Sequence, residues 1–216
     1  LGRGAMPIVL LVITGSLAAL LVNAFAGPWR YPSALPASWT LLHWTSNFQN
    51  LLTPLLNTLL ISVGSTFLAL VLVIVTLESE RQSGKLRSTA TWLLYLPLLV
   101  PQIVFLFGLI VLTESMQWQG TMSLVIFGHF LFVLPYVFLS LSEAYRQLDP
   151  RWSQVASTLG ASPLKSFWRI RIPLLLAPCL TAIAIGMAIS IGLFLPTQLL
   201  GAGRITTITS EAVALS

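Results

Sequence analysis

Five long apolar stretches constrain this chain more than any other feature of its sequence. Each is longer than twenty residues and contains no Asp, Glu, Lys or Arg. They are Met6–Ala26, Leu55–Leu77, Trp92–Thr113, Thr121–Ser142 and Leu174–Leu200. About 20 apolar residues of helix cross a bilayer core, and a helix satisfies its own backbone polar groups there. Because the stretches are continuously apolar rather than alternating, a β-barrel is disfavoured. The pattern predicts an all-α integral membrane protein, a bundle with five transmembrane helices.

Composition excludes the soluble and disordered classes. Charged residues make up 8% of the chain, against about 25% in an average soluble domain, and a hydrophobic share of 56% excludes disorder. The single cysteine, Cys179, excludes an internal disulfide framework and a multi-cysteine metal site. The first stretch has a rival interpretation, since Arg3, an apolar run and Ala24–Ala26 resemble a cleavable signal peptide. Its length favours a retained helix.

The distribution of Lys and Arg predicts the orientation. When the connection between the fourth and fifth stretches is placed in the cytoplasm, nine of the eleven basic residues lie inside. Only Arg30 and Arg204 then lie outside, as the positive-inside rule requires. The net charge of +5 is therefore a signal of topology, and no nucleic-acid partner is expected. We expect an N-terminal helix with an outer loop over residues 1–54 and a core over residues 55–216.

The connection over residues 143–173 is long for a link between membrane helices, and it carries helix signals. Asp149-Pro150 predicts a helix start, and Gly160 predicts its end. Ser162-Pro163 repeats the start signal, and Pro173 marks the approach to the fifth stretch. The predicted hairpin has an exposed apolar face. It either rests on the membrane interface or docks a soluble partner, and these residues leave both alternatives open.

The order of residues in this hairpin carries a motif. It reads Gln154-Val155-Ala156, three residues, Gly160, nine residues, then Ile170-Arg171-Ile172-Pro173. This resembles the cytoplasmic loop of permease subunits of binding-protein-dependent ABC importers, where Glu-Ala-Ala precedes the Gly and Ile-x-Leu-Pro ends the motif. Gln154 stands where the family has an acidic residue. The resemblance extends from Asn57-Thr58 to the C-terminus, and residues 195–212 are similar to the iron, thiamine, sulfate and polyamine group.

The resemblance implies a type I importer permease in the bacterial cytoplasmic membrane. Such a subunit forms the substrate pathway with a second permease core, either another copy or a fused one, and receives substrate from an extracytoplasmic binding protein. A cytoplasmic ABC ATPase dimer binds ATP and Mg²⁺. No cofactor is therefore expected on this chain, which also lacks a phosphate-binding loop. The hairpin over residues 149–173 is expected to contact the ATPase through Trp152, Gln154, Val155, Ala156, Leu159, Gly160, Phe167, Ile170 and Pro173.

Polar residues inside the apolar stretches are candidates for lining the pathway, because buried polar groups in a membrane face a cavity or another helix. The candidates are Asn57, Gln102, His129, Thr197 and Gln198. For His129 the structural alternative is a hydrogen bond between helices. The last residues read as the start of another helix on the outer side, so a further span and a fragment of a longer permease are expected; the second half of a fused double permease is one alternative.

Two other classes of function are alternatives to an importer permease. A stand-alone secondary carrier or channel needs an ionisable coupling group, for which His129 is the only intramembrane candidate. A membrane enzyme needs a nucleophile with a partner, paired carboxylates or a metal set. Cys179 has no such partner in the sequence, and His43 and His129 are not at ligand spacing. No catalytic residue and no metal site are expected.

Overall fold

The computed structural model describes residues 5–29, 33, 36–41, 45, 48–83 and 88–214. Within these residues the regular structure is helical, apart from one isolated bridge between Ala26 and Trp39. The all-α prediction is confirmed. Among the described helices, three are long and apolar enough to cross a membrane, and a fourth candidate is a bent pair of helices. The chain divides into two compact units, Leu1–Leu52 and Thr53–Ser216, and each is described by itself.

The longest described helix of the first unit is α1 (Ala5–Phe25), whose described apolar side chains are almost all exposed within the chain. A helix that is apolar on every side is typical of a membrane span. The backbone returns beside the end of this helix: Gly27 N donates to Ser38 O at 2.8 Å, and Thr40 N donates to Phe25 O at 2.9 Å.

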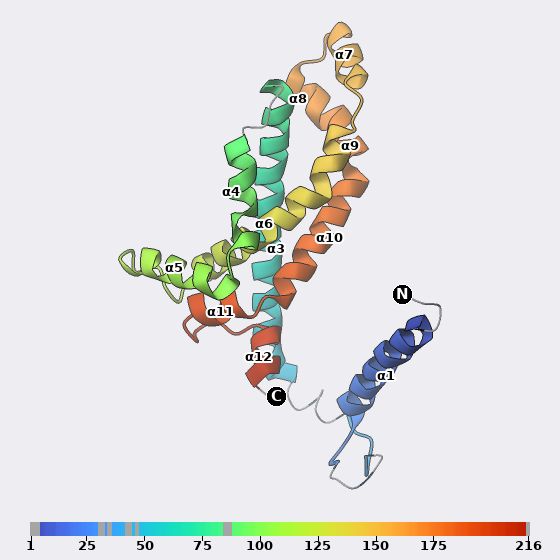
Figure 1. The fold of residues 1–216 in the computed structure, drawn as a ribbon, viewed down its shortest axis with the longest axis vertical. Helices are drawn as coiled ribbons and strands as arrows, with labels where there is room; N and C mark the ends of the chain where they lie inside the picture. The colour runs from blue at the N-terminus through green and yellow to red at the C-terminus, as the bar shows by residue number, and fades with distance from the viewer. Residues whose placement is uncertain are drawn as a thin grey trace. The chain divides into compact units, whose positions relative to one another are not determined.

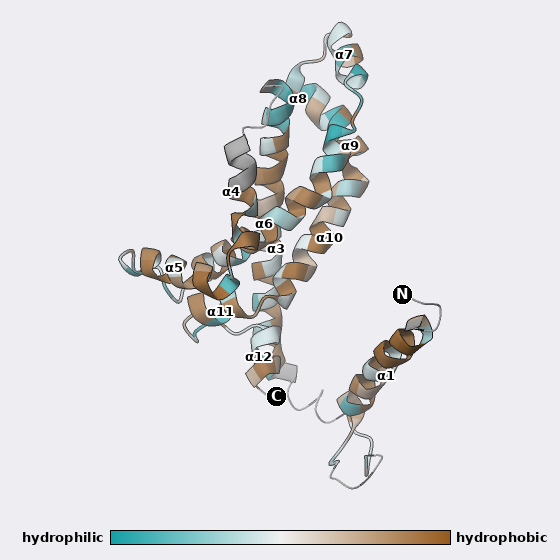
Figure 2. Ribbon diagram, viewed as in Figure 1, coloured by the Kyte–Doolittle hydropathy of each residue, from teal (hydrophilic) through white to brown (hydrophobic). Residues whose placement is uncertain are grey.

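Three long helices form the framework of the second unit (Figure 1): α3 (Phe48–Ser83), α6 (Met122–Arg146) and α10 (Leu176–Gly192). Their shared core is apolar and includes Val73, Leu77, Val137, Phe138 and Ala182. Figure 2 shows apolar residues along the middle of these helices and polar residues gathered toward α7–α9. This is the distribution expected of helices that pass through an apolar layer and end in a polar one.

Gly186 allows α10 to approach its neighbours closely. A Cβ atom at this position would lie 2.8 Å from Thr66 Cγ2 of α3 and 3.1 Å from Val137 Cγ2 of α6. Small residues at helix crossings in membranes permit such approaches. The crossing of α3, α6 and α10 therefore depends on the missing side chain.

The stretch over residues 92–113, which the sequence predicted as a single membrane span, is not one continuous helix. It is divided into α4 (Ser88–Leu99) and α5 (Gln102–Glu114). Pro101 is responsible, because its ring would clash with the carbonyl of Pro97 in a continuing helix and disfavours helical geometry at Val100. Each piece is shorter than the roughly 20 residues that cross a bilayer core alone.

The stretch over residues 174–200 is also interrupted. The chain bends by 70° at Leu175, between α9 (Ile172–Leu174) and α10. A second break at Leu193-Phe194 separates α10 from α11 (Leu195–Leu200). Pro178 and Pro196 follow these breaks by a few residues, and each withholds an N–H from the residue four before it. The expected helix start after these breaks is confirmed as α12 (Ile208–Ala214).

Candidate functional site

The predicted cytoplasmic hairpin begins with α7 (Arg151–Thr158). Asp149 Oδ1 accepts a hydrogen bond from Arg151 N at 2.9 Å, which satisfies one of the free N–H groups at the helix start. Gly160 ends the helix in the left-handed conformation, with φ +75°. Ala161 N then donates to Ala156 O at 2.9 Å and Gly160 N to Ser157 O at 3.0 Å, the paired bonds of a Schellman motif. The predicted start and stop are both confirmed.

The second arm of the hairpin is less regular than predicted. Ser162 caps α8 (Pro163–Ser166) by accepting from Lys165 N at 3.3 Å. The chain then widens into a π-helix over Phe167–Arg171, in which Ile172 N donates to Phe167 O. Pro173 provides no N–H for the carbonyl four residues earlier, so the normal α-helical ladder is interrupted there. One predicted helix is therefore three consecutive segments.

One exposed side of α7 is apolar. Trp152, Val155 and Leu159 expose 57%, 55% and 81% of their surface, and they fall at helical spacing on one side. An apolar patch of this kind outside the membrane marks a surface for a partner or for lipid. Ala156 is buried at 5% exposure and faces the protein instead.

The other predicted coupling residues are dispersed around this face. Gln154 and Gly160 are exposed, and the position of a Cβ at Gly160 is open space. Phe167 and Ile170 are half-buried, and Pro173 is exposed. The Phe167 ring meets Trp168 edge-on, with centroids 5.3 Å apart. The structure therefore gathers Trp152, Val155 and Leu159 into one surface and leaves the remaining predicted residues behind or beside it.

A polar clamp that the sequence did not predict holds the hairpin to the membrane helices. Arg171 Nη1 pairs with Glu78 Oε1 at the end of α3, and the Tyr145 hydroxyl of α6 donates to Glu78 Oε2. Ser153 Oγ of α7 accepts from Arg171 Nε at 3.3 Å and from Arg81 Nη2 at 3.4 Å. The Arg171 and Glu78 side chains expose only 11% and 20% of their surface. We call these five residues the clamp.

The clamp joins four segments that are distant in sequence. Charge-assisted hydrogen bonds in partly buried surroundings are stronger than neutral ones and restrict geometry. The clamp therefore connects α7 to the ends of α3 and α6 through side-chain hydrogen bonds. A signal for the clamp existed in the sequence: Glu78 directly follows one apolar stretch, and Arg171 shortly precedes another. Opposite charges at the same predicted membrane face are natural partners.

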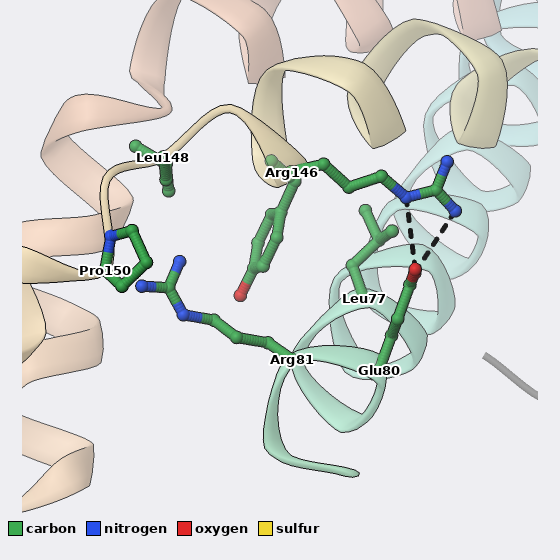
Figure 3. A pocket seen from close by; sticks show the side chains of 7 residues that line it. Leu77, Glu80, Arg81, Arg146, Leu148 and Pro150 are labelled. Atoms are coloured by element: carbon green, nitrogen blue, oxygen red, sulfur yellow. Dashed lines mark hydrogen bonds and ion pairs between the residues drawn. The ribbon is translucent and has the colours of Figure 1, made fainter. Parts of the chain in front are cut away.

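A second ion pair lies beside the clamp. Arg146 donates to Glu80 through Nε at 3.1 Å and Nη2 at 3.2 Å. Figure 3 shows this pair and the Arg81 side chain extending toward Pro150, where the hairpin begins. The residues in Figure 3 line a cavity of about 360 Å³ between α3, α6 and the start of the hairpin. The base of the hairpin thus combines charged and apolar side chains around this cavity.

Two of the five predicted pathway residues meet in a buried polar cluster. His129 Nδ1 lies 2.9 Å from Ser190 Oγ, and His129 Nε2 lies 3.0 Å from Thr197 Oγ1. Ser65 Oγ donates to Ser190 Oγ at 3.2 Å. The cluster links α3, α6, α10 and α11, and both ring nitrogens of His129 have partners. The alternative of a hydrogen bond between helices is the arrangement observed for His129.

The other three pathway candidates lie elsewhere. Asn57 Nδ2 donates to Thr206 O at 3.0 Å and ties the outer end of α3 to the segment before α12. Gln198 is exposed on α11. Gln102 opens α5, and its Nε2 atom is buried without a hydrogen-bond partner among the described residues. The structure therefore does not gather the five candidates into one site.

Comparison with known proteins decides the family. A family described as "Binding-protein-dependent transport system inner membrane component" matches residues 71–216. The matched part contains the hairpin, all five clamp residues, and the members of the polar cluster on α6, α10 and α11. The chain belongs to this family. It is a multi-pass protein of the inner membrane, and the family resemblance inferred from the hairpin motif is confirmed.

Relatives of this chain include several transport permease proteins. The inner membrane ABC transporter permease protein YnjC of Escherichia coli is 39% identical over 75% of this chain, which spans 30% of that protein. The putative 2-aminoethylphosphonate transport permease PhnV of Salmonella typhimurium is 27% identical over 82% of this chain and 67% of its own length. The molybdenum transport permease ModB of Mycobacterium bovis is 30% identical over 74% of this chain and 64% of its own length.

Proposed function

We propose that this chain is a permease subunit of an ATP-driven importer. It forms part of the substrate pathway and couples that pathway to a cytoplasmic ABC ATPase dimer through the hairpin over residues 149–173. A second permease core completes the pathway, and an extracytoplasmic binding protein delivers the substrate. ATP and Mg²⁺ belong to the ATPase, so this chain is a transport subunit rather than an enzyme.

One observation carries the proposal: an exposed apolar helix face is held to the membrane helices by a charged clamp. The face of Trp152, Val155 and Leu159 supplies the large apolar side chains that dominate the energetics of protein interfaces. An amphipathic hairpin resting on lipid needs no such rigid connection. The clamp supports docking of a moving partner, because packed helices transmit displacements as rigid bodies.

The experiment that tests the proposal is retention of the ATPase. In the complex purified from membranes, Leu159→Asp is expected to reduce the amount of bound ATPase at least tenfold, because it places a charge at the centre of the apolar face. Met116→Asp is the matched control. Met116 is an equally apolar residue, 68% exposed, in the turn after α5 at the opposite membrane face. ATPase retained in full by Leu159→Asp would contradict the proposal.

A further inference from the structure

A groove of about 510 Å³ lies between the C-terminal end of α3 and the second arm of the hairpin, which Figure 1 shows side by side. Its lining comes from both sides: Pro163, Leu164 and Phe167 of the arm, and Ile74, Val75, Glu78, Ser79 and Gln82 of α3. The apolar face of α7 is a separate surface, because Trp152, Val155 and Leu159 are not among the residues that line this groove.

The groove crosses the inner boundary of the membrane. Its wall on α3 begins at Ile74, inside the apolar stretch that ends at Leu77, and continues to Gln82 among the charged residues that follow. The rise from Ile74 to Gln82 is about 12 Å, whereas the headgroup layer is about 5–7 Å thick on each side of a bilayer. The groove therefore reaches from hydrocarbon to water. A lipid has its apolar and polar parts in the same order, and a soluble protein does not enter the hydrocarbon.

The apolar side chains at the groove are uncovered within the chain. Leu164 of the arm is 68% exposed, and Val75 of α3 is 59% exposed. Trp168, 62% exposed, packs edge-on against Phe167, and tryptophan is typical of the headgroup level of a membrane. An acyl chain seated in the groove would cover Leu164 and Val75.

The charge of the second arm selects the headgroup. From Pro163 to Pro173 the sequence contains three basic residues and no acidic one. Lys165 and Arg169 are exposed. The third, Arg171, is paired with Glu78, so the carboxylate of the groove is already neutralised. Basic residues on the cytoplasmic side of membrane helices attract anionic lipid headgroups.

We propose that this groove binds an anionic phospholipid of the inner leaflet. Its acyl chain lies against Val75, Leu164 and Phe167, and its phosphate lies beside Lys165 and Arg169. The two arms of the hairpin then have different partners, since α7 meets the ATPase and the second arm holds a lipid. Binding of the lipid does not require the ATPase, so the inference goes beyond the proposed function.

Native mass spectrometry of the purified permease complex, with and without its ATPase, tests the headgroup. The probes are phosphatidylglycerol and phosphatidylcholine with identical oleoyl chains, and phosphatidylglycerol is expected to bind about tenfold more tightly. Lys165→Gln combined with Arg169→Gln should remove this preference, because each basic residue near an anionic lipid contributes roughly fivefold in affinity. Arg151→Gln is the matched control. It removes an exposed basic residue of α7, outside the second arm, and should leave the preference unchanged.

A second pair of variants tests the groove itself. Val75→Trp fills the groove with an indole ring and is expected to weaken binding of both phospholipids about tenfold. Val71→Trp makes the same change one turn earlier on α3, at a residue that is 45% exposed and is not among those that line the groove. It should leave binding unchanged. Retention of the ATPase by each variant shows that the hairpin is folded.

Four results would overturn the inference. They are equal affinity for the two phospholipids, a preference that survives loss of both basic residues, binding that Val75→Trp leaves intact, and release of phosphatidylglycerol when the ATPase is added. The last result would assign the groove to the ATPase instead. None of the four removes the apolar face of α7, so failure of the lipid site leaves the proposed function standing. Loss of ATPase docking with lipid binding preserved would have the opposite meaning.

Discussion

At the scale of single residues, the clamp is the feature that connects the hairpin to the membrane helices. Glu78 accepts from both Arg171 and Tyr145, so one carboxylate holds segments from three parts of the chain. Removing one member of such a partly buried group leaves the others without partners. Removing a clamp residue is therefore expected to weaken the connection between the hairpin and the helices more than the stability of the apolar core.

Reversal of the charge pair tests this role. Arg171→Glu places two carboxylates together and is expected to weaken coupling of ATP hydrolysis to transport by tenfold or more. The double variant Glu78→Arg with Arg171→Glu restores opposite charges and should recover part of the loss. The coupling free energy between the two sites, from a double-mutant cycle on thermal unfolding in detergent, is expected to be about 1–3 kcal/mol. Additive effects of the two single substitutions would show that the pair is not coupled.

Gly160 is needed for its backbone conformation rather than for space. Its φ of +75° is disfavoured for other residues, while a Cβ there would meet nothing within 4 Å. Gly160→Ala should therefore cost about 1 kcal/mol through backbone strain alone and increase hydrogen exchange in α7. Gly192→Ala is the matched control, because it also meets nothing within 4 Å and has no positive φ. Equal hydrogen exchange of α7 in the two variants would exclude backbone strain as the reason for glycine at position 160.

At the scale of elements, close contact and interruption determine how the helices pack. Gly186 brings α10 against stiff β-branched side chains of α3 and α6. Pro101 and Pro196 divide two predicted spans into shorter helices. The bundle is thus packed closely near Gly186, while residues beside the breaks at Pro101 and Leu193 line one cavity.

The close approach at Gly186 predicts that two glycine substitutions change the free energy of unfolding by different amounts. Gly186→Ala forces a methyl group against Thr66 and Val137 and should destabilise the protein by about 1–3 kcal/mol. Gly108→Ala adds a methyl group where nothing lies within 4 Å, and should stabilise α5 by about 0.5–1 kcal/mol. Thermal unfolding in detergent measures both changes. Similar changes in the two variants would mean that the crossing of α3, α6 and α10 is looser than described.

At the scale of the whole molecule, function depends on orientation. The hairpin transmits force from an ATPase only if it lies in the cytoplasm, where nine of the eleven basic residues are predicted to lie. The exposed face of α7 and the turn after α5 must then be on opposite sides of the membrane.

Labelling in whole cells tests this orientation. In a Cys179→Ala background, Trp152→Cys is expected to react with a membrane-impermeant maleimide only after the cells are permeabilised. Met116→Cys, 68% exposed in the turn after α5, should react in intact cells. Reaction of the cysteine at position 152 in intact cells would exclude contact between the hairpin and a cytoplasmic ATPase.

Much of this protein follows from local patterns in the sequence. Apolar stretches without charges require membrane helices, because lipid offers no partner for a backbone polar group. The caps of the hairpin depend on residues only a few positions apart, so Asp149, Gly160 and Ser162 predicted its first helix and the start of its second arm. The distribution of basic residues predicts an orientation for the same reason, since each loop contributes independently.

Only the tertiary structure decided which distant groups meet. Hydropathy is averaged over many residues, so a proline in a long apolar run does not show where a helix ends; the breaks beside Pro101 and Pro196 are set by the backbone geometry of the structure. The pairing of Glu78 with Arg171 and of His129 with Ser190 and Thr197 joins residues between 61 and 93 positions apart. Such contacts depend on how whole helices cross, and helix crossings are set by side-chain shape on several elements at once. The sequence determined that the chain spans a membrane and carries a capped hairpin; the tertiary structure decided which residues that hairpin contacts.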